Sequence, residues 1–273
     1  MFLADYHLHC LPYSPDAEPT MLELVEGAIA NGMTHICITN HVENCSQSPA
    51  APMQFAPFED WDELKAEFDA VRDNLGGQVD MRLGAEVAGP HFRPDLGREI
   101  YGYDFLDFII GSIHNLRESD DFYFMDYPEN SDDFRPTMEE YLREYVLMAK
   151  SHLCDVLGHI GYMQRYMARQ GKFMDIMAFE DQLRDIFRAC VENGVGIEVN
   201  TSDRRDVLGR FTPDMPVLKL YRACGGEIIT AGSDAHTAVH AGAGIPEAYE
   251  LLRACGFKYV CLFKQHKPEF VRL

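Results

Sequence analysis

Short apolar stretches alternate with segments of helical spacing along the whole chain. Leu22, Val25 and Ile29 recur every three or four residues, as one face of an α-helix requires. The stretches between such segments are almost continuously apolar, as at 108–110, which is typical of strands covered on both faces. We predict eight strands, at residues 3–7, 34–39, 80–87, 107–114, 155–159, 194–201, 227–233 and 257–263.

Alternating strands and helices indicate a parallel sheet, and about seven or eight such units are the number that closes a barrel. We therefore predict an α/β barrel, with a doubly wound open sheet as the alternative. The 273 residues contain no internal repeat, low-complexity tract or linker, so we predict a single domain over residues 1–273.

Polar residues stand where most of these strands end. In a barrel the carboxyl ends of the strands meet at one face, where catalytic groups collect. His7 and His9 share one face of a strand, and Glu86 lies in an apolar run where a carboxylate is costly unless it is paired or bound to metal. We expect a polynuclear metal site at this face. The strand-end residues that could hold a metal or touch a substrate are His7, His9, His41, Glu86, His114, His159, Asn200, Asp234 and His236.

Two long connections, 42–58 and 115–136, directly follow His41 and His114. Long loops inside a compact domain tend to be functional. We therefore predict that these two segments form walls or lids of the site.

The order of the strand-end motifs resembles the PHP (polymerase and histidinol phosphatase) superfamily. The motifs are H-x-H, N-H, G-x-E, G-S-x-H, G-H and G-S-D-A-H, and they contain His7, His41, Glu86, His114, His159 and Asp234 in that order. The stretches 9–16, 121–126 and 198–202 are similar to the histidinol-phosphate phosphatase branch. The resemblance implies a distorted (β/α)7 TIM-like barrel that holds two or three metal ions.

The resemblance also implies a role for each ligand. A first metal would be held by His7, His9, Glu86 and Asp234, and Glu86 would bridge to a second metal held by His114 and His159. A third metal would be held by Asp16, His41 and His236, although Asp16 could instead cap the following helix.

The chain departs from the family pattern at three places. Cys10 replaces the usual threonine, and Asn40 replaces the usual aspartate before His41. The segment 203–206 reads Asp-Arg-Arg-Asp instead of Gly-Leu-Arg-Lys, which puts the identity of the substrate in doubt.

Composition and charge narrow the range of partners. The net charge is −20, from 44 acidic and 24 basic residues, which argues against nucleic acid or an anionic membrane. The eight cysteines contain no C-x-x-C pair, as expected of free thiols in a reducing compartment. With no basic leader at the start and no apolar run of ~18 residues, we expect a soluble cytoplasmic protein. The sequence leaves the oligomeric state open.

Charge balance favours a phosphate ester as the small-molecule substrate. Three divalent ions bring six positive charges against the three carboxylates of Asp16, Glu86 and Asp234, so a phosphate dianion can be accommodated. By the resemblance, we predict a metal-dependent phosphomonoesterase that hydrolyses L-histidinol phosphate in histidine biosynthesis, with a metal-bridging hydroxide as nucleophile. The ligand types suit zinc, iron or manganese.

The remaining predicted roles concern the substrate. Asp234 or His236 would protonate the leaving group. Arg165 and Arg205, or Arg204 in place of Arg205, would clamp the phosphate, and Asn200 would contact the substrate. The alternatives are a phosphoesterase for another small phosphate or a nucleotide, a metal-dependent amide hydrolase, and a non-catalytic metal-binding barrel. Against the amide hydrolase, no lysine stands at a strand end to serve as a carboxylated bridge.

Overall fold

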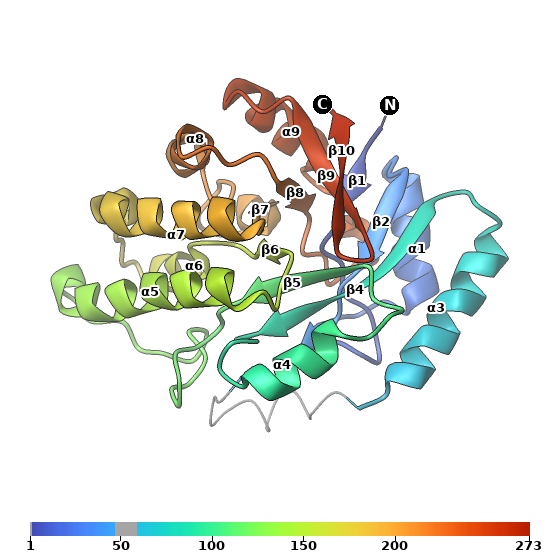
Figure 1. The fold of residues 1–273 in the computed structure, drawn as a ribbon, viewed down its shortest axis with the longest axis horizontal. Coiled ribbons are helices and arrows are strands. Elements are labelled where there is room, and N and C mark those ends of the chain that lie inside the picture. The colour runs from blue at the N-terminus through green and yellow to red at the C-terminus, as the bar shows by residue number, and fades with distance from the viewer. Residues whose placement is uncertain (1, 47–58) are drawn as a thin grey trace.

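The computed structural model describes residues 2–46 and 59–273, so most of the predicted loop 42–58 lies outside the described residues. Parallel strands form one curved sheet in the order β1, β2, β4, β5, β6, β7 and β8 (Figure 1). Their bounds are β1 Ala4–Asp5, β2 His35–Ile38, β4 Asp80–Ala88, β5 Phe108–Ser112, β6 Val156–Leu157, β7 Gly196–Asn200 and β8 Ile229–Gly232. A short strand, β3 (His41–Val42), follows β2 and pairs with the same neighbour, β4.

Helices surround the strands on the outside (Figure 1). They are α1 Met21–Ala30, α3 Trp61–Leu75, α4 Pro94–Tyr101, α5 Arg135–Ser151, α6 Tyr162–Arg169, α7 Glu180–Asn193, α8 Met215–Ala223 and α9 Ile245–Ala254, with the short 3-10 helices η1 Ser131–Phe134, η2 Ile176–Phe179, η3 Ser202–Arg205 and η4 Ala238–His240. Local chemistry sets their ends: α1 begins at a capping box, in which Thr20 and Glu23 bond each other's backbone amides. Within the described ranges, no helix is both long and apolar enough to cross a membrane.

The first and last strands of the sheet lie side by side, so the sheet nearly closes into a barrel. Beside β1, the amide of Tyr6 donates to the carbonyl oxygen of Ala231 at 3.0 Å, and just beyond it the amide of Asp234 donates to that of His7 at 2.8 Å. This closure confirms the predicted barrel of seven parallel strands and excludes the doubly wound open sheet.

The predicted eighth strand, 257–263, is not part of the barrel. It overlaps β9 (Tyr259–Lys264), which pairs antiparallel with β10 (Lys267–Arg272) in a hairpin. Phe263 packs on Phe108 at the start of β5, with ring centroids 4.9 Å apart, and the amide of His266 donates to the carbonyl of Asp107. The hairpin therefore covers the amino end of the barrel, opposite the end at which the predicted site residues stand.

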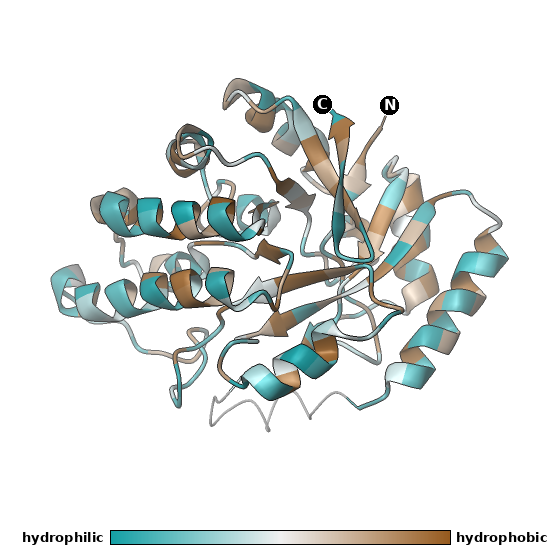
Figure 2. Cartoon of the chain, in the orientation of Figure 1, coloured by the Kyte–Doolittle hydropathy of each residue, from teal (hydrophilic) through white to brown (hydrophobic). Residues whose placement is uncertain are grey.

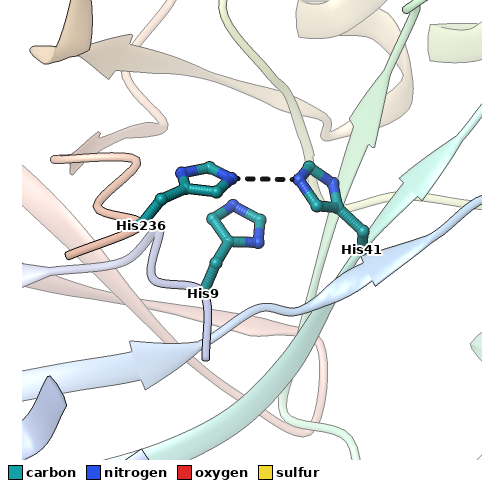
Figure 3. A group of neighbouring side chains, drawn as sticks. All are labelled: His9, His41 and His236. Atoms are coloured by element: carbon teal, nitrogen blue, oxygen red, sulfur yellow. Dashed lines mark hydrogen bonds between the residues drawn. The ribbon is translucent and has the colours of Figure 1, made fainter. Parts of the chain in front are cut away.

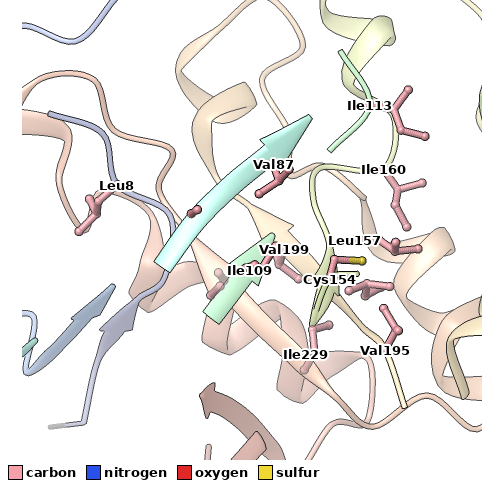
Figure 4. Packing of buried hydrophobic residues seen from close by; sticks show 14 of the residues in the cluster. Leu8, Val87, Ile109, Ile113, Cys154, Leu157, Ile160, Val195, Val199 and Ile229 are labelled. Carbon is pink, nitrogen blue, oxygen red and sulfur yellow. The ribbon is translucent and has the colours of Figure 1, made fainter. Parts of the chain in front are cut away.

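Two apolar layers follow from the alternation of side chains along the strands. In β5, Ile109 belongs to the large cluster between strands and helices, together with Leu157 and Val199 (Figure 4). Its neighbours Phe108 and Ile110 belong to a smaller cluster inside the barrel. Figure 2 shows the same division, with apolar strands and helices that turn polar faces to solvent. The barrel is therefore filled at its amino end, which leaves the carboxyl end for polar groups.

Asp5 joins the elements that close the barrel. Its buried carboxylate accepts hydrogen bonds from the amide of Ser233 at 2.8 Å, the amide of Gly242 at 2.7 Å and the hydroxyl of Ser233. The amide of His7 also donates to it, at 3.3 Å. Burial raises the pKa of Asp5, and these four donors offset only part of that effect. The carboxylate thus ties β1 to the end of β8 and to the loop that follows it.

Replacing Asp5 by alanine should destabilise the barrel strongly, because it removes the side-chain acceptor of three buried amides. We expect the free energy of unfolding to fall by about 3–5 kcal/mol, measured by denaturant titration. Asp104→Ala, at an exposed position, should change it by less than about 0.5 kcal/mol. Equal stability of the two variants would show that Asp5 does not hold the closure.

Candidate metal centre

Glu86 lies at the carboxyl end of the barrel, and its side chain is only 1% exposed. Its Oε2 atom faces three imidazoles: it lies 2.8 Å from His41 Nδ1, 3.3 Å from His7 Nε2 and 3.7 Å from His9 Nε2. The register of the sheet explains the first of these contacts, because His41 in β3 pairs directly with Glu86 in β4.

The second oxygen of Glu86 faces a different pair of rings. Oε1 lies 2.7 Å from His159 Nε2 and 3.2 Å from His114 Nε2. His114 and His159 each stand two residues beyond their strand, β5 and β6. Each oxygen of Glu86 therefore faces its own set of imidazoles, an arrangement suited to a carboxylate shared by two metal ions.

Asp234 completes the set around His7 and His9. Its Oδ1 atom lies 3.4 Å from His9 Nε2 and 3.7 Å from His7 Nε2. Its backbone has a φ of 52°, in the left-handed region that side chains other than glycine rarely adopt. Strain of this kind is typically kept at functional sites.

His236 adds another imidazole, which lies beside those of His9 and His41 (Figure 3). The Nε2 atoms of His41 and His236 lie 3.2 Å apart, and Asp16 Oδ2 lies 3.2 Å from His236 Nε2 and 3.6 Å from His41 Nε2. The helix that follows Asp16 is capped by Thr20, so Asp16 does not serve as its cap. The structure therefore brings all nine predicted metal-binding residues into one cluster. They are His7, His9, Asp16, His41, Glu86, His114, His159, Asp234 and His236.

The buried atoms at the centre fit bound cations. Within the described residues, His7 Nε2 and His9 Nε2 are buried and make no hydrogen bond, although buried polar atoms are nearly always bonded. Four sets of three residues there have possible ligand atoms within 4.8 Å of one another: His9, His41 and His236; His7, His9 and Asp234; His7, Glu86 and His159; and His41, Glu43 and His114. Imidazole and carboxylate donors suit divalent transition metals.

Electrostatics also favours cations at this position. Burial alone would raise the pKa of Glu86, but the imidazoles of His7, His114 and His41 hold it well below its usual range. Burial and the facing rings of His41 and His236 hold the pKa of His9 well below its usual range. Glu86 is therefore anionic and His9 neutral, which are the forms that bind metal. The facing carboxylates raise the pKa of His7, His41 and His114, so a bound cation would displace protons from these imidazoles.

Side chains outside the cluster orient its imidazoles. Glu198 Oε1 lies 2.6 Å from His7 Nδ1, and its Oε2 accepts from the amide of His159 at 2.9 Å. Glu43 lies 2.8 Å from His114 Nδ1, and Ser14 Oγ lies 3.2 Å from His9 Nδ1. An oxygen that accepts the Nδ1 proton leaves the Nε2 lone pair free for a metal.

Sequence reasoning assigned no role to these outer residues, although one signal was available. Glu198 lies in the apolar run of β7, so the burial cost that singled out Glu86 applies to it equally. Gly232 permits its close approach to His7: an added Cβ would lie 2.3 Å from both Glu198 Oε1 and His7 Cβ.

The three predicted substrate-binding residues occupy different positions. Arg165 lines the pocket, and its guanidinium donates to Asp203 and Ser202. Arg205 is not among the pocket-lining residues, and it donates to the carbonyl oxygen of Ser233 at 2.7 Å. Asn200 is buried and donates to Glu198 and Asp234, each at 3.2 Å. Only Arg165 is thus placed to touch a bound molecule directly.

A pocket of about 430 Å³ opens over the cluster, which is large enough for a small metabolite. Metal-cluster residues form its floor, and its walls contain Glu43, Asp121, Tyr123, Tyr162, Arg165 and Tyr166. Asp121 and Tyr123 belong to the long connection 115–136, as predicted for a wall of the site.

A family model, the PHP domain, matches residues 5–202 of this sequence. The chain belongs to the PHP family. The match includes seven of the nine clustered residues, all except Asp234 and His236, and it confirms the resemblance found in the motifs.

Several relatives of this PHP protein match it over nearly their whole length. A histidinol-phosphatase of Lactococcus lactis subsp. lactis is 26% identical over 96% of this chain and 95% of its own. A Thermotoga maritima protein described as "Probable histidinol-phosphatase" is 26% identical over 95% of each chain. The crystal structure of histidinol phosphate phosphatase from Lactococcus lactis, complexed with zinc, L-histidinol and phosphate, has a TM-score of 0.76 at 23% identity and covers 98% of both chains. This last likeness supports the fold.

Replacing Glu198 by glutamine should weaken metal binding while leaving all nine clustered residues in place. An amide cannot supply the anionic acceptor that fixes His7, so we expect metal affinity to fall roughly 10- to 100-fold. Chelator competition with metal analysis measures this directly. Glu192→Gln, an exposed change on α7, should leave the affinity unaltered. Wild-type affinity in Glu198→Gln would show that the contact does not tune the centre.

Proposed function

We propose that this PHP protein is a metal-dependent phosphomonoesterase that hydrolyses L-histidinol phosphate to L-histidinol and phosphate. The observation that carries the proposal is the shared carboxylate Glu86, whose two oxygens face separate imidazole groups on the floor of a pocket that also contains Arg165. Relatives described as histidinol-phosphatases span about the same length as this chain and support the choice of substrate.

The clustered residues would hold two or three divalent ions, of zinc, iron or manganese. His7, His9, Glu86 and Asp234 form the first group, Glu86 with His114 and His159 the second, and Asp16, His41 and His236 the third. When bound, such ions supply a nucleophilic water at neutral pH and neutralise the phosphate oxygens.

Residues of the chain then position and complete the reaction. Arg165 orients the phosphate through its guanidinium, which Asp203 holds in place from the other side. Asp203 belongs to the segment that departs from the family pattern. In this chain the altered segment therefore supplies the carboxylate that holds Arg165 in place. Asp234 and His236 both line the pocket and are the two candidates to protonate the leaving alkoxide.

Steady-state assays of the metal-loaded protein against a panel of phosphomonoesters test the function. We expect L-histidinol phosphate to give the highest kcat/KM, above other amino-alcohol phosphates, sugar phosphates and nucleotides. A higher kcat/KM for another ester would replace the proposed substrate, and failure to hydrolyse any of them would exclude the phosphatase.

Glu86→Ala should be the most damaging change to a single ligand, because it removes the bridge and an anionic charge together. We expect loss of metal from both groups that it joins and a fall in kcat of at least about 100-fold. Metal analysis beside the exposed control Glu26→Ala measures the first effect. A full complement of metal in Glu86→Ala would rule out the bridging role.

Arg165→Ala should lower kcat/KM by about 1.5–3 kcal/mol, the contribution of a hydrogen bond to a charged group, without changing metal content. Lysine should recover only part of the loss, because it keeps the charge without the planar fork. Arg169→Ala is the matched control: Arg169 lies on the same helix, pairs with Asp206 and does not line the pocket. Unaltered kinetics in Arg165→Ala would mean that the metals alone hold the anion.

A further inference from the structure

We propose that Asp121 binds the positively charged end of the substrate, so that the pocket selects phosphate esters whose organic part carries an ammonium or imidazolium group. The inference rests on the proposed function and names the part of the same site that reads the molecule beyond its phosphate.

The backbone fixes Asp121 relative to the metal centre. The next residue, Phe122, is fully buried against Tyr141, and its amide donates to the carbonyl oxygen of His114 at 2.9 Å. The hydroxyl of Tyr127 donates to the carbonyl of Phe122 at 2.8 Å. Asp121 is therefore anchored to a predicted metal-binding residue, rather than carried on a free loop.

The carboxylate of Asp121 lacks a cationic partner. Every other carboxylate that lines the pocket faces imidazoles: Asp16 faces His41 and His236, Glu43 faces His114, and Glu86 and Asp234 face the cluster. Among the described residues, Asp121 makes no ion pair, and the amide of Tyr123 donates to it at 2.8 Å. Burial raises its pKa to about 6, and the imidazoles of His114 and His41 offset only part of that effect.

Aromatic rings complete the surroundings of Asp121. Tyr123, Tyr162 and Tyr166 line the same pocket, and the centroids of Tyr123 and Tyr166 lie 5.5 Å apart. Tyr123 is 54% exposed, although a large aromatic ring is normally more deeply buried. Arg165 and Arg169 already lie over the rings of Tyr162 and Tyr166, so Tyr123 is the ring that remains exposed. A carboxylate beside an exposed aromatic ring is a favourable environment for an organic cation, because both the charge and the ring quadrupole attract it.

The same group would repel a phosphate, so Asp121 belongs to the other end of the substrate. L-Histidinol phosphate carries an ammonium group and an imidazole whose ordinary pKa is about 6.5, and either can face a carboxylate. Simple phosphate esters without a cation gain nothing from it. Asp121 thus distinguishes amino-alcohol phosphates from neutral-tailed esters, while the metal-binding cluster and Arg165 act on both.

Asp121→Asn tests this with two substrates. We expect KM for L-histidinol phosphate to rise roughly 10- to 100-fold, as for a lost charged hydrogen bond, with kcat little changed. For p-nitrophenyl phosphate, whose organic part is uncharged, kcat/KM should stay within about twofold of wild type. Asp121→Glu should restore part of the affinity. Asp126→Asn, an exposed carboxylate of the same segment that does not line the pocket, should behave as wild type.

Calorimetric titration with L-histidinol provides a readout without turnover. This cation has no phosphate, and its affinity should fall by a similar factor in Asp121→Asn. An equal fall in kcat/KM for both ester substrates, or unchanged affinity for L-histidinol, would overturn the proposal. Asp121 would then not bind the cationic part of the substrate.

The proposed function can fail separately. If wild type prefers an ester other than L-histidinol phosphate, 2-aminoethyl phosphate and ethyl phosphate decide the role of Asp121, because they differ by one ammonium group. A wild-type preference for the ammonium ester that disappears in Asp121→Asn supports the inference. No such preference, or one that survives the substitution, overturns it.

Discussion

A single buried carboxylate constrains the whole carboxyl end of the barrel. Glu86 is 1% exposed, and a charge at this depth is stable only when positive charge or hydrogen-bond donors surround it. Imidazoles from four strand ends do so, from the segments that hold His7 and His9, His41, His114 and His159. Parallel strands make this possible, because their carboxyl ends meet at one face. A barrel closes that face into a ring, which lets residues far apart in sequence approach one side chain from opposite directions.

The contacts that close the barrel lie directly beside the residues of the candidate metal centre. Asp5 holds Ser233, the residue next to Asp234, and it lies two residues before His7. Glu198 spans the barrel in a similar way, with one oxygen on the ring of His7 and the other on the backbone of His159. A change in the closure would therefore move possible ligand atoms. Such supporting contacts keep donor atoms in place before a metal binds, which lowers the cost of binding it.

The acidic character of the protein, with a net charge of −20, is compatible with an anionic substrate. The carboxylates of the cluster are positioned to bind cations. Bound divalent ions would make the local charge positive, which attracts an anionic substrate. Arg165 and Asp121 both line the pocket, so it contains a fixed positive and a fixed negative side chain. If Asp121 binds the cationic part of the substrate as proposed, the two side chains would also set the direction in which a molecule with a phosphate and a cation lies.

The sequence by itself determined the barrel and placed eight of the nine clustered residues at one face, whereas Asp16, which lies in a loop, was assigned through the resemblance to the PHP family. Hydrophobic period and strand ends are local properties, and in a parallel barrel every strand end points to the same face. That is why His7 and Asp234 could be assigned to one site although 227 positions separate them along the chain. The prediction that residues 257–263 form an eighth barrel strand was wrong. An apolar run indicates a strand but not its partner, and this strand pairs with β10 in a hairpin.

Only the tertiary structure decided which side chains support the cluster and which face the pocket. Glu198 contacts His7 across 191 residues and Glu43 contacts His114 across 71, and no local pattern specifies either pair. Arg165 and Arg205 were equivalent by position, yet one lines the pocket and the other bonds the carbonyl of Ser233. The reason is geometric: the chain dictates where a strand ends, but the direction of a long side chain beyond that end depends on the neighbours that closure of the barrel brings to it.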